Sequence, residues 1–303
     1  MSKRHFASAF SAILLLAAIA SLFVNGINFG LDFTGGTLIE LKYENPANLE
    51  GIRQQLKDDG YGSAVVVNFG SERDVLVRIQ TSDAELGDEI AAALRSAASA
   101  SVELKRVEFV GPQIGEELRD DGGIGLLFAL AVVMVYVALR FQYKFSFGAV
   151  AALAHDVVIV LGIFSVLQLD FDLTVLAAIL AVIGYSLNDT IVVSDRIREN
   201  FRKIRKSSPS DVIDISLTQT IGRTLITSLT TLLVLLALFF VGGELIRNFS
   251  IALIVGVVIG TYSSVYVAAN ILMVLNVSKE DLIVVEKEGE NLEDLSNIQN
   301  IDP

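Results

Sequence analysis

Long uncharged apolar stretches recur along this sequence and limit the folds that it can adopt. Several approach the roughly 20 residues that a helix needs to cross about 30 Å of hydrocarbon. Charged residues make up 19% of the chain and give a formal net charge of −12, but they lie outside these stretches. The sequence therefore predicts a membrane protein. The apolar stretches are 6–24, 124–139, 157–169, 173–187, 225–241 and 249–277.

The apolar stretches predict a bundle of six transmembrane helices when each is extended to a plausible helix end. Cations gather in alternate connections, so the positive-inside rule places both termini in the cytoplasm. The long segment 25–122 is then external. The predicted helices are 6–24, 123–141, 146–167, 173–194, 221–241 and 249–275. The cations that decide the orientation are Lys3, Arg4, Arg140, Lys144, Arg196, Arg198, Arg202, Lys203, Arg205 and Lys206.

The N-terminus allows a second interpretation. Lys3, Arg4, the apolar run and the small residues around Ala18 are also typical of a cleavable signal peptide. The run at 6–24 is longer than the roughly 7–15 residues of a usual signal core, which favours a retained helix. The topology of the later helices is the same in both cases.

The external segment changes to a pattern of short β-branched runs and helical runs. Its order predicts a small α+β domain of the ferredoxin-like βαββαβ type between helices one and two. It contains no histidine and no cysteine, so we expect a folded interaction module. The predicted elements are strand 37–43, helix 48–58, strand 64–69, strand 74–80, helix 83–97 with Asp83 as N-cap, and strand 102–110.

The two connections of this domain are rich in residues with special backbone properties. The segment 30–37 packs three glycines into eight residues, which permits positive φ angles or a close backbone approach. The segment 110–115 precedes the acidic residues of 116–121 and predicts a hinge followed by a solvated turn. The predicted hinge residues are Gly35, Gly36, Gly111 and Pro112.

Two aspartates in the membrane half are candidates for function, because an ionised side chain in hydrocarbon costs at least ~2.5 kcal/mol. Asp156, beside His155, is expected near the bilayer centre, and Asp189 about 9 Å from it on the cytoplasmic side. Arg223 begins helix five at the depth of Asp189, so we expect the two to pair. A buried pair of this kind rarely improves stability over apolar residues, which favours a functional role.

Small and hydroxylated residues surround these charges on helices four, five and six. They permit close packing and cross-helix hydrogen bonds, and they are also suited to a water wire. Gly256 and Gly260 have GxxxG spacing, which indicates packing. Together with the charges they predict a proton or sodium relay. The predicted relay is Asp189, Arg223 and Asp156, supported by Asn188, Ser186, Tyr185 and Thr190.

Composition excludes several other classes. The absence of cysteine excludes disulfides and thiolate metal sites, and we expect no metal and no cofactor. The acidic balance argues against nucleic-acid binding. No nucleophile–base pair or nucleotide loop indicates an enzyme. The domain boundaries follow as 1–24, 25–122, 123–277 and an acidic cytoplasmic tail at 278–303, which carries eight acidic and two basic residues.

The segments 30–37 and 110–112, His155-Asp156 and above all the run 184–200 (GYSLNDTIVVSDRIREN) resemble the SecF family. These proteins are subunits of the bacterial SecDF protein-export complex, in the resistance-nodulation-division superfamily. The resemblance covers nearly the whole chain. It departs from the family at Ser194, where phenylalanine is frequent, and this leaves the charged positions intact.

The resemblance implies a multi-pass protein of the bacterial inner membrane that pairs with SecD. Surrounded by membrane lipid, it would use the proton motive force to assist export of unfolded polypeptides through the SecYEG translocon. The family's proton-path aspartate falls on Asp189 and its helix-five arginine on Arg223. A second relay aspartate would come from SecD.

Two alternatives remain at this point. A small-molecule exporter of the same superfamily usually joins two halves with much larger external domains in one chain. A translocon scaffold without ion coupling is the other. The sequence leaves open whether protons or sodium ions are used, the ratio of subunits, and whether the external domain contacts the exported polypeptide.

Overall fold

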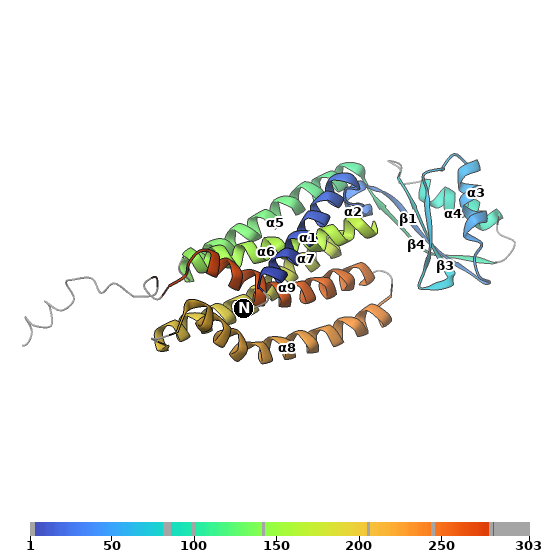
Figure 1. The fold of residues 1–303 in the computed structure, drawn as a ribbon. Coiled ribbons are helices and arrows are strands. Elements are labelled where there is room, and N and C mark those ends of the chain that lie inside the picture. The colour runs from blue at the N-terminus through green and yellow to red at the C-terminus, as the bar shows by residue number, and fades with distance from the viewer. Residues whose placement is uncertain are drawn as a thin grey trace, which may run out of the picture.

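The computed structural model describes residues 4–80, 86–97, 101–140, 143–204, 207–243, 246–278 and 281. Within this part of the chain, six helices are long and apolar enough to cross a membrane. This agrees with the six predicted helices. They form an elongated bundle with a small α/β domain at one end (Figure 1). The helices are α1 (Arg4–Val24), α5 (Pro112–Arg140), α6 (Tyr143–Leu167), α7 (Leu173–Lys203), α8 (Pro209–Val241) and α9 (Arg247–Val274).

Three helices, α5, α7 and α8, extend well beyond the ends predicted for them. Helix α5 begins at Pro112, so the residues expected to form an acidic turn at 116–121 are helical, and that prediction is wrong. Helix α7 continues to Lys203, and α8 begins at Pro209 behind the N-cap Ser208. Hydropathy marks where a helix enters lipid, whereas polar residues continue the same helix into water.

Small residues let the helices of the bundle approach closely. The GxxxG pair of α9 faces α7: a Cβ added at Gly256 would collide with Val182, and one at Gly260 would lie 3.0 Å from Ser186 Cβ. A Cβ at Gly162 of α6 would collide with Ala18 of α1. The sequence interpretation of Gly256 and Gly260 as packing residues is confirmed. Close packing of this kind is typical of membrane helices, where apolar side chains gain little from leaving lipid.

The α/β domain follows the predicted order of strands and helices. Its four strands form an antiparallel sheet in the order β2-β3-β1-β4, so β1 lies between β3 and β4. The predicted N-cap Asp83 lies outside the described residues. The elements are β1 (Gly36–Tyr43), α3 (Leu49–Asp58), β2 (Val65–Phe69), β3 (Ser71–Ile79), α4 (Leu86–Ala97) and β4 (Val102–Val110).

Alternation along the strands builds the core of this domain. Ile39 and Leu41 of β1 and Val75 of β3 are fully buried in one cluster with Leu56 of α3 and Leu94 of α4. Successive side chains of a strand point to opposite faces, so the intervening residues face away from the helices. The domain therefore has one covered and one open sheet face.

The two connections of the domain pack against each other. A short helix, α2 (Leu31–Thr34), leads to Gly35 and Gly36, which adopt φ values of 70° and 127°. A Cβ at Gly35 would lie 2.6 Å from Pro112 Cα, and one at Gly115 would lie 2.8 Å from Gly35 N. Gly35 and Pro112, one from each connection, therefore meet at one tight crossing.

A second contact ties the domain to the bundle. Arg78 of β3 forms a two-pronged ion pair with Asp170, in the turn between α6 and α7. Asn28 donates to the same carboxylate at 2.7 Å, and Asn248 donates to the Asp170 carbonyl at 3.0 Å. Residues from three other parts of the chain thus converge on Asp170.

Gly35→Ala is expected to destabilise this crossing by about 1–3 kcal/mol, because alanine would be strained at φ 70° and its Cβ would meet Pro112. The measurement is thermal unfolding of the purified chain in detergent. Gly123→Ala is the matched control, since a Cβ at Gly123 of α5 meets nothing within 4 Å. Equal melting temperatures for the two variants would contradict the tight crossing.

Candidate functional site

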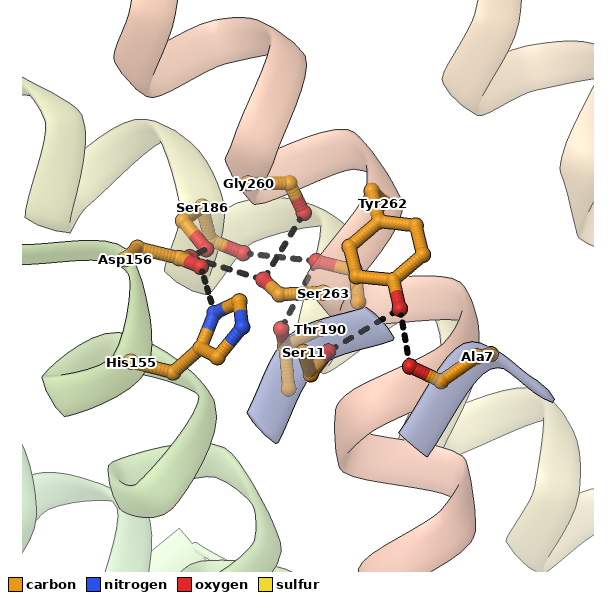
Figure 2. Close-up of polar contacts among 10 residues, drawn as sticks. Ala7, Ser11, His155, Asp156, Ser186, Thr190, Gly260, Tyr262 and Ser263 are labelled. Carbon is orange, nitrogen blue, oxygen red and sulfur yellow. Dashed lines mark hydrogen bonds and ion pairs between the residues drawn. The ribbon is translucent and has the colours of Figure 1, made fainter. Parts of the chain in front are cut away.

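Asp156 lies at the centre of a buried hydrogen-bond network in the bundle. Its side chain belongs to α6 and is 1% exposed. Ser186 of α7 donates to Asp156 Oδ2 at 2.6 Å, and Ser263 of α9 donates to the same oxygen at 2.7 Å. The other oxygen, Oδ1, lies 3.0 Å from His155 Nδ1. One carboxylate thus connects three helices, as Figure 2 shows.

Helix packing makes this approach possible. Gly260 lies one turn before Ser263 on α9, and a Cβ there would lie 3.6 Å from Asp156 Oδ2 and 3.0 Å from Ser186 Cβ. A larger residue would hold α9 away from the carboxylate. The GxxxG spacing therefore serves the polar site as well as the packing of the helices.

Most of the predicted support residues lie in the same interior. Thr190 of α7 bonds to Ser264 of α9 at 2.9 Å. Tyr185 of α7 donates to Ser228 of α8 at 3.3 Å, and Ser228 bonds to Thr261 of α9 at 2.6 Å. These contacts join α7, α8 and α9 in the interior of the bundle. Other predicted hydroxyls of α8 bond to carbonyls of their own helix: Thr227, Thr230 and Thr231.

Asp189 is also buried, but its surroundings differ from those of Asp156. It is 3% exposed, and its Oδ2 has no hydrogen-bond partner among the residues that the structure describes. The buried hydroxyl of Thr224, on the neighbouring helix α8, likewise has no partner there. Burying polar atoms without partners is unfavourable, so the hydrogen-bonding capacity of Asp189 and Thr224 is incompletely satisfied.

Arg223 does not form the expected ion pair with Asp189 among the described contacts. Its side chain is exposed in this chain. Thr224 is buried instead. Neighbouring helix residues are turned by about 100° from each other, so Arg223 and Thr224 face different ways. The prediction placed Arg223 at the depth of Asp189 by counting residues along the helix, and it did not include the direction in which each side chain faces.

Asn188 departs from the prediction too. It was expected beside the relay, yet it is exposed on α7, together with Gly184, Ala181 and Ala177. These positions follow a spacing of three and four residues and so form one face of the helix. No group of three or more metal-binding side chains occurs in the described part of the chain.

Two contributions were missed from the sequence. Ser263 was recognised only as one of many hydroxyls, and His155 only as part of a motif. Ser263 lies 107 positions from Asp156, so no local spacing relates the two. The neighbours His155 and Asp156, both buried in a membrane helix, were the one available signal.

Comparison with known proteins places this site in context. Residues 89–278 match the family described as "Protein export membrane protein SecD/SecF, C-terminal", and residues 20–47 match the "SecD/SecF GG Motif". The chain is 56% identical over 284 residues to protein translocase subunit SecF of Pseudomonas aeruginosa, with 93% of each chain covered. The chain belongs to the SecF family. A SecF relative from Vibrio alginolyticus is 51% identical over 292 residues, covering 94% of this chain and 93% of the relative.

Solved SecDF structures share the fold. The crystal structure of SecDF, a translocon-associated membrane protein, from Thermus thermophilus matches with a TM-score of 0.83 at 39% identity. The match covers 91% of this chain and 38% of that one. SecDF in its super-membrane-facing form matches with a TM-score of 0.69 at 34% identity, covering 99% and 40% respectively. The SecF-family GG motif contains Gly35 and Gly36, the glycines at the domain crossing.

Proposed function

We propose that this chain is a subunit of a Sec translocase auxiliary complex in the bacterial inner membrane. It pairs with a SecD partner and uses the proton motive force to promote export of unfolded polypeptides through SecYEG. Both termini lie in the cytoplasm, and the α/β domain lies in the periplasm. The chain acts in transport and not as an enzyme.

The observation that carries this proposal is the incomplete site around Asp189. A buried carboxylate oxygen without a partner and an exposed arginine on the next helix are unfavourable in lipid. Both are explained if a second membrane subunit covers this side of the bundle. A further relay aspartate from SecD would then complete the pathway, and Arg223 would be buried against it.

The exposed faces of the bundle support a partner in the membrane. Of the 18-residue apolar segment in each helix, only 6% is buried within this chain in α5 and 17% in α8. The exposed face of α7 that contains Ala177, Ala181, Gly184 and Asn188 combines small residues with a polar amide, which favours close packing by another helix. We assign this face to the contact with SecD.

The α/β domain is consistent in its architecture with the proposed transport function. The order βαββαβ with strand order β2-β3-β1-β4 is that of a split βαβ unit, so we infer a ferredoxin-like domain. It carries no predicted catalytic set. It would act by moving, not by chemistry.

The mechanism follows from the charge change at Asp189. Protonation removes the negative charge of Asp189, so its attraction to the arginine cation of α8 weakens. Such a shift would reach the α/β domain through two contacts. One is the crossing of Gly35 and Pro112 at the start of α5, and the other is the Arg78–Asp170 ion pair beside α7. Gly111 and Pro112 would serve as hinge residues at the start of α5.

A deletion strain separates this function from its alternatives. We expect loss of the gene to slow secretion of a periplasmic reporter and to leave drug susceptibility unchanged. The purified chain should retain a partner with its own external domain and six further helices. Increased drug susceptibility with normal secretion would instead support a small-molecule exporter. Slow secretion in the deletion strain, combined with wild-type secretion that does not respond to collapse of the proton gradient, would support a scaffold.

A further inference from the structure

A groove of about 310 Å³ lies between α1, α6 and α9. Its lining comes from the first half of α1, the first half of α6 and the second half of α9. The α/β domain follows the end of α1, so the groove lies in the half of the bundle remote from that domain. Under the proposed function this is the cytoplasmic half.

The groove surface is mainly apolar, and three hydrogen bonds join α1 and α9 along it. Asn270 of α9 donates to Ser8 of α1 at 2.5 Å, and Ser11 bonds to the Tyr262 hydroxyl at 2.9 Å. Tyr262 also donates to the Ala7 carbonyl at 2.7 Å. The hydroxyl oxygens keep acceptor capacity that water can fill and lipid tails cannot.

His155 connects the groove to the buried carboxylate. It lines the groove and is 4% exposed. Its Nδ1 lies 3.0 Å from Asp156 Oδ1, whereas its Nε2 is buried and has no partner among the described residues. Figure 2 shows Nε2 on the side of the ring toward Ser11 and Tyr262, away from Asp156. A buried ring nitrogen without a partner indicates a site for water.

We propose that His155 passes protons between Asp156 and water in this groove. The proton on Asp156 Oδ1 moves to Nδ1, and the ring, then charged, releases the proton on Nε2 to a groove water. The products are ionised Asp156, neutral imidazole and a hydronium ion, and tautomer exchange through water restores the starting ring. Imidazole suits this role because each of its two nitrogens can bind or release a proton near neutral pH. The other titratable side chains of the groove are the phenols Tyr262 and Tyr266.

This inference rests on the proposed function and assigns the path by which protons leave Asp156. The test uses the full chain with its partner in vesicles that contain a pH-sensitive dye. His155→Ala is expected to slow proton uptake at least about tenfold. Added imidazole should restore much of the rate, because the groove is large enough for it. Pyrrole has the same ring size but cannot accept a proton at its nitrogen, so it should not restore uptake.

Two further variants separate a relay from a structural role. His155→Gln keeps a hydrogen-bond donor near Asp156 but cannot pass a proton on, so it should remain as slow as alanine. Ala12→Phe fills the groove without changing His155 and should slow uptake several-fold. Ala9→Phe is the matched control, since Ala9 is exposed on α1 and does not line the groove.

The outcomes distinguish a failure of this inference from a failure of the proposed function. If His155→Ala keeps normal uptake while Asp189→Asn abolishes it, the proposed function stands and the relay through His155 is overturned. Restoration by pyrrole and imidazole alike would show that the ring only fills space, and would also overturn it. Normal uptake in both the His155 and Asp189 variants would remove the proposed function itself.

Discussion

Asp189→Asn should reduce proton-driven export by about 100-fold or more, the range in which loss of a proton-transferring group usually falls. Asparagine is nearly isosteric with aspartate and keeps the helix contacts of a side chain that is 3% exposed. It cannot take up and release a proton. The measurement is secretion of a reporter by membrane vesicles with and without a proton gradient.

The controls for this prediction isolate the charge. Asp120→Asn makes the same chemical change on α5, where the side chain is 71% exposed, and should leave export normal. Arg223→Lys keeps the charge but loses the planar guanidinium, and we expect a partial loss. The relay role of Asp189 would be refuted by near-normal gradient-dependent export from a variant that still binds its partner.

The fold was largely readable from the sequence, because its dominant forces leave periodic signals. Lipid requires long apolar helices, and the half-buried sheet requires alternation along strands such as β3. The ends of helices were less readable. Helix α5 begins at Pro112 because proline is well suited to the first turn of a helix, although the acidic residues after it indicated a turn.

The site was only partly readable, because it depends on how the helices are rotated. Sequence reasoning found Asp156 and Asp189 by their charge in an apolar context. It could not find that Ser186 and Ser263 share one oxygen of Asp156, since that requires the facing of three helices. The same limit explains why Arg223 was assigned to a direct pair. Depth along a helix follows from counting residues, whereas facing follows from packing.

The two aspartates divide the site between them. Asp156 has its hydrogen-bond partners within this chain, so its position is fixed by α6, α7 and α9 together. Asp189 lacks a partner at one oxygen. A satisfied carboxylate resists rearrangement, whereas an incompletely satisfied one gains from a new neighbour or a proton. We therefore expect Asp156 to hold three helices together at the position where it exchanges a proton with His155, and Asp189 to respond to the partner subunit.

Asp156→Ala should lower the stability of the bundle by about 2–4 kcal/mol, because two cross-links between helices and the contact with His155 are lost at once. Hydrogen bonds inside membrane proteins average about 0.6 kcal/mol and reach about 1.7 kcal/mol each. Removal of the carboxylate also leaves its buried donors without an acceptor, which adds to this loss. The measurement is thermal or denaturant unfolding of the purified chain in detergent.

Single serine variants test whether the network itself carries this stability. Ser263→Ala should destabilise the bundle by about 1 kcal/mol, and Ser186→Ala by a similar amount. Both serines donate to Asp156 Oδ2, so their effects should not add in a double-mutant cycle. Ser250→Ala is the matched control: Ser250 is fully buried on α9, but its hydroxyl donates to the Ile246 carbonyl of the same segment. If Ser250→Ala and Ser263→Ala unfold alike, the cross-helix bonds to Asp156 do not hold the bundle together, and the aspartate must be retained for proton transfer alone.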